Sequence, residues 1–240
     1  MSVIETIKKI IKNANSIVFF GGAGVSTESG IPDFRGTGGL YTEENEIDPQ
    51  EILTPEYMMQ NPEDFYSYYK NNMLYPSAQP NEAHKTLAKM EQDGKLTAVI
   101  TQNIDGLHQK AGSKNVIELH GTSLNNYCTS CGKVYDLSYI LDSDGVPYCE
   151  SCQGFVRPDV VMYHEGLNVK KFYDAEEAIY YADVLIVGGT SLTVQPAASL
   201  INSYQGEHLI IINKDPTPYD GIAEFVIRDS ISETLLKIYK

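Results

Sequence analysis

Short runs of aliphatic residues, separated by helical patterns, constrain the fold of this chain more than any other feature. The first run, Ser16–Phe20, is apolar from its second residue onward and ends in the turn Gly21-Gly22-Ala23-Gly24. Similar runs occupy residues 96–100, 116–119, 183–187, 209–212 and 224–227. Such runs are typical of parallel strands that are buried on both faces and alternate with helices. We therefore predict an α/β fold with a doubly wound, Rossmann-like parallel sheet.

Length and composition predict one domain, residues 1–240, that carries two insertions. Hydrophobic residues make up 42% and charged residues 21% of the chain, which are ordinary values for a globular protein. Residues 36–80 are polar and contain many tyrosines and prolines, which predicts a loop that leads into a small helical module. Residues 125–156 contain all four cysteines and little apolar periodicity, which predicts a separate lobe.

The charge balance excludes some partners. Eighteen Lys and Arg residues against 32 Asp and Glu residues give a net charge of −14, which argues against direct nucleic-acid binding. The same balance favours a cationic partner such as a lysine-rich peptide, although acidity also serves solubility. No apolar run has the roughly 18–20 residues of a membrane helix, and the N-terminus lacks the features of a secretory signal. We predict a cytoplasmic protein with no membrane partner.

Two Cys-x-x-Cys pairs, Cys128 with Cys131 and Cys149 with Cys152, are separated by 17 residues. Each pair can aim two thiolates at one ion, and two pairs complete the tetrahedral coordination that zinc prefers. Four thiolates leave no open position for water, so we predict a structural rather than a catalytic zinc. Four buried thiols or a redox pair are the alternative interpretation.

Glycine-rich and polar segments follow four of the predicted strands. Gly22–Gly24 follow the first strand and Gly189–Ser191 the fourth, and glycines there let the backbone approach phosphate groups. The segment Gln102–Asp105 can hydrogen-bond ribose hydroxyls or an amide, although ordinary strand-end capping would give the same pattern. His120 follows another strand and has the chemistry of a general base near neutral pH. Together these segments predict a dinucleotide site at the carboxyl edge of the sheet.

Residues 22–35, Gly-Ala-Gly-Val-Ser-Thr-Glu-Ser-Gly-Ile-Pro-Asp-Phe-Arg, resemble the signature of the sirtuins, the NAD-dependent protein deacylases. Thr101–Asp105, Glu118–Gly121, the paired cysteines, Gly189–Leu192 and Ile212-Asn213 follow in the family's order. The resemblance covers nearly the whole chain and is greatest to compact bacterial members. It implies removal of acetyl or longer neutral acyl groups from protein lysines, with NAD as co-substrate, structural zinc, and release of nicotinamide and O-acyl-ADP-ribose.

The resemblance also implies roles for individual residues. His120 matches the catalytic base that deprotonates a ribose hydroxyl, and Asn103 matches a catalytic residue of the nicotinamide pocket. Phe34 would cover the reacting sugar and shield it from water. The positions that match the family's cofactor site are Gly22, Ala23, Gly24, Thr27, Asp33, Phe34, Arg35, Gln102, Asn103, Ile104, Asp105, His120, Gly189, Thr190, Ser191, Asn213 and Asp229.

An acyl-lysine peptide or protein segment would lie extended beside residues 160–165 and pair with them through main-chain hydrogen bonds. The positions that match the family's substrate site are Val160, Val161, Met162, Tyr163, His164, Glu165 and Tyr66. Three positions depart from the family pattern: Gly21 replaces a common Thr, His164 a common Gly, and Tyr69 the Arg of acid-preferring sirtuins. Without that guanidinium, a succinyl or malonyl carboxylate would be buried unpaired, so we predict a preference for neutral acyl groups.

Three other functions compete with deacylation. The same activated sugar could be trapped by another nucleophile, which would make the chain a protein ADP-ribosyltransferase. The chain could also be an NAD-sensing, zinc-bearing interaction module without turnover, or an oxidoreductase. The combination of His120 with Asn103 favours the deacylase, whereas only the glycine turn supports the oxidoreductase. The oligomeric state and the physiological substrates leave no sequence signal.

Overall fold

The computed structural model describes residues 2–34, 36, 39–40 and 47–239. Its centre is a six-stranded parallel sheet in the order β3-β2-β1-β7-β8-β9. The strands are β1 (Ile17–Gly21), β2 (Leu96–Thr101), β3 (Val116–Glu118), β7 (Val184–Gly188), β8 (His208–Ile212) and β9 (Phe225–Ile227). The doubly wound parallel sheet and its six predicted strands are therefore confirmed. The strand order reverses between β1 and β7, and ligands of such folds bind at this point.

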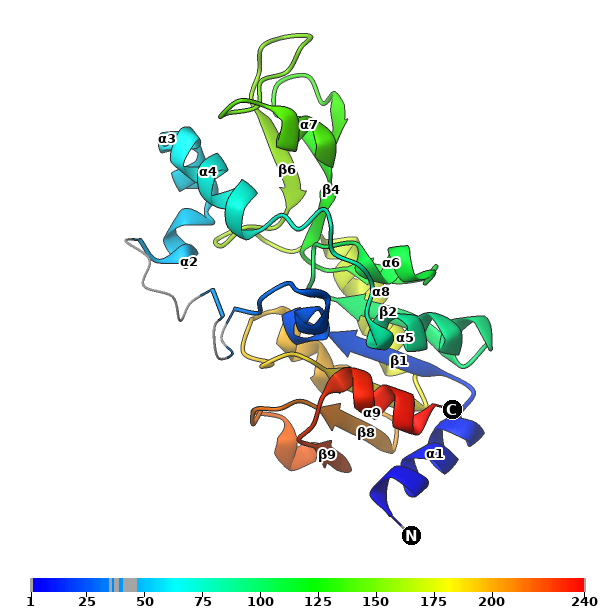
Figure 1. Ribbon diagram of the computed structural model, residues 1–240. Helices are drawn as coiled ribbons and strands as arrows, with labels where there is room; N and C mark the ends of the chain where they lie inside the picture. Colours follow the sequence, from blue (N-terminus) through cyan, green and yellow to red (C-terminus); the bar gives the residue numbers. More distant parts are fainter. Residues whose placement is uncertain (1, 35, 37–38, 41–46, 240) are drawn as a thin grey trace.

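Helices cover both faces of the sheet, as predicted (Figure 1). On one face lie α1 (Val3–Asn13), α5 (Glu82–Gln92) and α9 (Ile231–Ile238), and on the other α8 (Val169–Tyr180) and the 3₁₀ helix η3 (Ala197–Ser203). Successive side chains of β1 point to opposite faces, so Phe19 joins the first core and Phe20 the second. Shorter helices are η1 (Ala23–Val25), η2 (Thr27–Ser29), α6 (Leu107–Ala111) and η4 (Asp220–Ile222).

Three short helices form the module that the sequence predicts within residues 36–80. They are α2 (Pro49–Ile52), α3 (Pro55–Gln60) and α4 (Pro62–Asn72). Each begins with a proline, which is favoured at the first helical position because the missing N–H would have no partner there. The side chains of Asp48 and Thr54 accept backbone N–H groups at the starts of α2 and α3.

A small antiparallel sheet in the order β5-β4-β6 carries the cysteines. It consists of β4 (Gly121–Cys128), β5 (Val134–Asp136) and β6 (Val156–Val160), with α7 (Leu137–Asp142) beside it. The sheet starts before residue 125 and ends beyond residue 156, the boundaries predicted from the sequence. The reason is that β4 and β6 already pair between Gly121 and Val160, next to the main sheet.

The helical module and the cysteine-bearing lobe form one body at one end of the molecule (Figure 1). Phe65 and Tyr69 of α4 share a buried core with Ile140 and Val156 of the lobe. Lys70 Nζ, also from α4, donates hydrogen bonds to the carbonyl oxygens of Ser143 (2.6 Å) and Gly145 (2.9 Å). This body faces the carboxyl ends of the central strands.

Candidate active site

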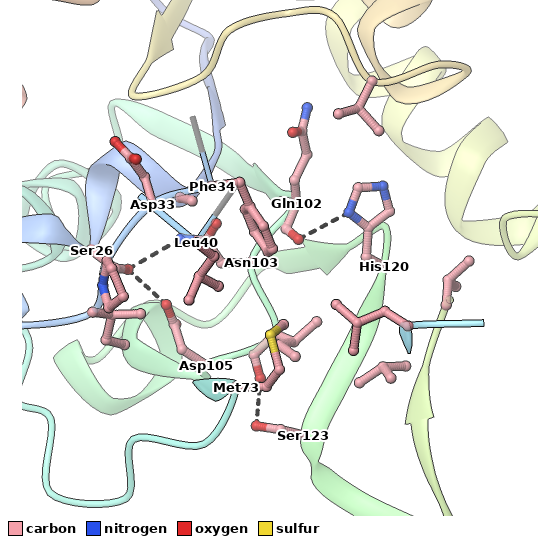
Figure 2. A pocket seen from close by; sticks show the side chains of 18 of the residues that line it. Ser26, Asp33, Phe34, Leu40, Met73, Gln102, Asn103, Asp105, His120 and Ser123 are labelled. Carbon is pink, nitrogen blue, oxygen red and sulfur yellow. Dashed lines mark hydrogen bonds between the residues drawn. The ribbon is translucent and has the colours of Figure 1, made fainter. Parts of the chain in front are cut away.

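A cavity of about 860 Å³ lies where the central sheet, the module and the lobe meet. Figure 2 shows its interior, with side chains from the strand exits on one side and from the module and lobe on the other. Of the predicted cofactor positions, those that line it are Ala23, Gly24, Asp33, Phe34, Gln102, Asn103, Ile104, Asp105, His120, Gly189, Thr190, Ser191 and Asn213. Residues from five separate chain segments therefore converge on one space.

Of the other four predicted cofactor positions, three are described and do not line the cavity. Gly22 and Thr27 belong to the first glycine turn but do not line the cavity among the residues described. Asp229 lies on the surface, where its carboxylate accepts the Ser230 N–H and pairs with Lys237. Arg35 lies outside the described residues. The cavity wall therefore contains most of the phosphate-side residues predicted from the motif, and Asp229 is engaged elsewhere.

The two glycine turns touch each other at the point where the strand order reverses. The Gly24 N–H donates to the Gly189 carbonyl oxygen at 2.8 Å. A Cβ atom on Gly24 would lie 2.8 Å from Gly189 Cα, a backbone atom that cannot move aside. Gly189 itself has φ of +61°, in the region that glycine adopts without strain. The two backbones can approach each other this closely only because neither residue carries a side chain.

Ser26 connects the first turn to the segment that follows β2. Its buried hydroxyl donates to Asp105 Oδ2 at 2.6 Å and accepts from Asn103 Nδ2 at 3.1 Å (Figure 2). His84 Nε2 lies 3.5 Å from the Ser26 hydroxyl oxygen. Burial lowers the pKa of His84 to about 4, against the opposing charge of Asp105, so this imidazole is neutral at physiological pH. Ser26 thereby fixes the two side chains predicted to face nicotinamide.

His120 is oriented by the main chain of its neighbour strand. Its Nδ1 lies 3.0 Å from the carbonyl oxygen of Gln102, an acceptor, so Nδ1 carries the proton (Figure 2). This contact leaves Nε2 as the unprotonated nitrogen on the cavity side. Burial lowers the pKa of His120 below its ordinary value, although the hydrogen bond to Gln102 opposes the shift. The imidazole is therefore in its basic form at neutral pH.

The cavity offers groups that fit a dinucleotide. The side-chain Nε2 of Gln102 is buried and has no hydrogen-bond partner among the described residues. A buried donor of this kind needs an acceptor, and a ribose hydroxyl would supply one. The paired glycine turns provide close backbone approach for phosphates, and Asn213 lines the far side of the cavity. These features match the needs of NAD at both ends of the molecule.

The predicted substrate segment, residues 160–165, lines the cavity along its whole length. Its main chain is already engaged in part, because the N–H groups of Val161 and Tyr163 donate to the carbonyls of His120 (2.8 Å) and Leu53 (3.0 Å). The carboxylate of Glu165 is also engaged: both of its oxygens accept from Arg157 at 2.9 Å. Glu165 thus shapes the segment rather than offering a free charge.

Tyr66 does not lie where the motif comparison places it. The side chain is buried in the core shared by the module and the lobe, and its hydroxyl donates to the Val156 carbonyl oxygen. Burial raises the pKa of this hydroxyl. Its neighbours on the same helix, Phe65 and Tyr69, line the cavity instead. Residues four apart share a helix face, and Tyr66 points away from that face.

The four cysteines meet in the lobe as the spacing predicts. Their Sγ atoms all lie within 4.8 Å of one another, with Cys128 and Cys149 buried and Cys131 and Cys152 exposed. Thiolates that share one tetrahedral zinc lie about 3.8 Å apart, since each Zn–S bond is about 2.3 Å. The arrangement therefore fits a four-thiolate zinc site. Tyr135 Oη approaches Cys149 Sγ at 3.1 Å.

Comparison with known proteins agrees with this geometry. A family model described as the Sir2 family matches residues 22–196. This chain belongs to the Sir2 family. It is 54% identical over 238 residues to an NAD-dependent protein deacetylase of Clostridium perfringens, covering 98% of both chains. It is 53% identical to the protein of that name from Clostridium tetani, covering 98% of this chain and 96% of the relative.

Solved structures of Sir2 proteins share the fold. A Sir2 homologue in complex with NAD has a TM-score of 0.90 at 39% identity, covering 99% of this chain and 93% of the other. A Sir2 variant with a deacetylated p53 peptide and 3'-O-acetyl ADP ribose has a TM-score of 0.89 at 38% identity, covering 98% and 96%. The sirtuin resemblance predicted from the motifs is thereby confirmed.

Two features of this Sir2 site were missed by reading the sequence. Ser26 stands inside the quoted signature, but its hydroxyl had no predicted partner. His84 lies on an apolar helix stripe, and its side chain also completes a reciprocal cap with Asn81 at the start of α5. The Asn-x-x-His spacing was the available signal. Within the described part of the chain, every helix is too short or too polar to span a membrane.

Proposed function

We propose that this Sir2 chain is an NAD-dependent protein-lysine deacetylase. The observation that carries the proposal is that the basic nitrogen of His120 borders the same cavity as the glycine turns and the segment 160–165. A base, a phosphate cradle and a peptide-binding edge are thus in reach of one another. The Clostridium relatives carry this activity in their names.

NAD, when bound, would supply the ribose carbon that the acyl oxygen attacks, with nicotinamide as the leaving group, and the ribose hydroxyl that finally carries the acyl group. The chain's own residues then handle binding and protons. His120 Nε2 accepts the proton of a ribose hydroxyl, while Nδ1 keeps its proton on the Gln102 carbonyl oxygen. Positioned base catalysis of this kind is typically worth about 10²–10⁴ in rate.

Other residues of the cavity orient the reactants and exclude water. Ser26 holds the amide of Asn103 and the carboxylate of Asp105 in fixed positions beside the strand exit. Phe34 lines the cavity near Gln102 and Asn103 (Figure 2), where it would limit water access to the reacting sugar. These contacts support the assignment of the segment Asn103–Asp105 to the nicotinamide end of the cofactor.

The acyl group would enter a largely apolar part of the cavity. Phe65, Tyr69, Met73 and Leu124 line it, and burial raises the pKa of the Tyr69 hydroxyl, so this group is neutral and supplies no cation for an acidic acyl chain. A succinyl carboxylate would be left without a guanidinium partner. We therefore propose acetyl and neutral acyl chains as substrates, with acidic chains disfavoured.

The proposal extends to the whole chain. Residues 1–240 would form one catalytic domain, and the zinc held by the four cysteines would be structural, because four thiolates leave no open position. A cytoplasmic location follows from the cysteine usage. The solved relative with a deacetylated peptide and 3'-O-acetyl ADP ribose favours deacetylation over ADP-ribosyl transfer.

The test is incubation with NAD and an acetyl-lysine peptide, followed by mass spectrometry of the products. We expect nicotinamide and O-acetyl-ADP-ribose in equal amounts. His120→Ala should abolish both while NAD binding, measured by calorimetry, stays within a few-fold of wild type. ADP-ribose attached to protein would instead indicate ADP-ribosyl transfer, and formation of NADH would indicate an oxidoreductase. A chain that consumes no NAD would be a binding module. Faster removal of succinyl than of acetyl would overturn the argument from Tyr69.

A further inference from the structure

The turn that ends the substrate segment is held in a fixed shape. The Glu165 N–H donates to the Met162 carbonyl oxygen at 3.2 Å, and the Glu165 carboxylate accepts the Met162 N–H at 2.9 Å. Arg157 grips the same carboxylate through two nitrogens and also donates to the Val160 carbonyl oxygen at 3.1 Å. The backbone between these anchors has little freedom, because a half-buried, two-point ion pair closes the turn.

His164 occupies the strained position of this turn. Its φ is +69°, in the left-handed region, where a residue with a side chain is disfavoured by roughly 1–2 kcal/mol relative to the right-handed one. Glycine would adopt this conformation freely. The turn therefore fixes the backbone from which the imidazole projects; His164 lines the cavity, and its side chain is 74% exposed.

The imidazole points toward the helical module. His164 Nδ1 lies 3.9 Å from Glu56 Oε2, at the start of α3. His164 belongs to the substrate segment and Glu56 to α3, and both side chains are exposed. An extended peptide that pairs with residues 160–165 places its flanking residues about 3.3 Å apart along this edge. A side chain next to the acyl-lysine would therefore lie near His164 and Glu56 when the peptide binds along this edge.

The cavity next to the pair is lined by more acidic than basic side chains, although Arg157 already pairs with Glu165. Among the described residues that line the cavity, the carboxylates are Asp33, Asp105, Glu165 and Asp215, whereas Lys110 is the only Lys or Arg. The Lys110 ammonium donates a hydrogen bond to the Ala78 carbonyl oxygen at 2.8 Å. A basic flanking residue would find a carboxylate at Glu56, and an acidic one would be repelled.

We infer that His164 and Glu56 form a selectivity pair that favours a Lys or Arg over an acidic residue beside the acyl-lysine. The inference rests on the proposed deacetylase function. Glu56 supplies the charge. His164, fixed by its turn, holds that carboxylate over the peptide edge. The substrate class is therefore acyl-lysine within a basic stretch of polypeptide.

The test compares acetyl-lysine peptides that carry Arg, Ala or Glu at each of the two positions on either side. Wild type should give a higher kcat/KM for Arg than for Glu at one or more positions. Glu56→Gln should reduce that ratio about 10- to 30-fold, because at about 4–6 Å in water the attraction of Arg and the repulsion of Glu each contribute about 3- to 6-fold. Glu63→Gln is the matched control, because Glu63 is exposed on the neighbouring helix α4, whereas it is Glu56 that lies next to His164.

A second variant tests the positioning role of His164. His164→Gly should lower the Arg-to-Glu ratio by a smaller factor, and the double variant should match Glu56→Gln alone, since both changes act through one carboxylate. An equal ratio in Glu56→Gln, Glu63→Gln and wild type would overturn the inference. Wild type that releases no acetyl group from any peptide would instead refute the proposed function.

Discussion

The hydroxyl of Tyr135 provides a sharp test of the metal site. It donates to Cys149 Sγ at 3.1 Å and accepts the Glu150 N–H at 3.1 Å. The ring is 7% exposed, so water cannot replace the hydroxyl if it is removed. Tyr135→Phe therefore removes the hydrogen-bond partner of the Glu150 N–H and takes one donor from a thiolate that would bind zinc.

The magnitude follows from these two contacts. A hydrogen bond to a charged group contributes about 1.5–3 kcal/mol, and removal of an outer hydrogen-bond donor typically lowers metal affinity about 10- to 100-fold. We expect a loss of zinc affinity in this range and correspondingly faster zinc release. The assay is competition between the purified, zinc-loaded protein and a chromophoric chelator, followed by absorbance.

Tyr139→Phe is the matched control. This ring stacks on Tyr135 with centroids 4.1 Å apart, but its hydroxyl donates to the Tyr148 carbonyl oxygen and to no cysteine. The control should bind zinc within about 2-fold of wild type, well below the effect expected for an outer donor. Equal zinc affinity for Tyr135→Phe and wild type, or equal losses in both variants, would refute the reasoning.

Three further outcomes are expected. In the pH profile of kcat/KM, activity should fall on the acid side with an apparent pKa below the ordinary imidazole value of about 6.5. The reason is that burial lowers the pKa of His120 and only the neutral imidazole acts as the base. An apparent pKa above 7 for this fall would contradict the assignment. Gly24→Ala should weaken NAD binding at least about 10-fold by calorimetry, a loss of about 1.4 kcal/mol, because its Cβ would meet the Gly189 backbone, whereas Gly221→Ala, which meets nothing within 4 Å, should leave binding unchanged. His164→Gly should raise stability by about 0.5–1 kcal/mol and the Tm by about 1–3 °C through relief of the left-handed strain, and a lower Tm in a thermal melt would argue against that strain.

The fold was predictable because its signals are local. Each central strand is a short aliphatic run that is buried on both faces, and such runs have few other ways to fold. The cysteine cluster was predictable for a similar reason, since two Cys-x-x-Cys turns specify their own local geometry. Neither prediction needed knowledge of how distant segments pack.

The parts that the sequence did not predict depend on distant packing. Tyr66 and Tyr69 lie three residues apart on α4, yet only Tyr69 lines the cavity, because the rotation of that helix is set by the lobe it packs against. The contact of Ser26 with Asp105 joins residues 79 apart in the chain. No local pattern records such a contact, so the motif identified the residues but not their hydrogen bonds.

His120 contacts the rest of the protein at both its ring and its backbone. The ring Nδ1–H donates to the Gln102 carbonyl oxygen. The backbone carbonyl oxygen of His120 accepts the N–H of Val161 in the substrate segment. We therefore expect a polypeptide that displaces this segment to disturb the position of the proposed base as well. A poorly matched substrate should then lower kcat as well as binding affinity.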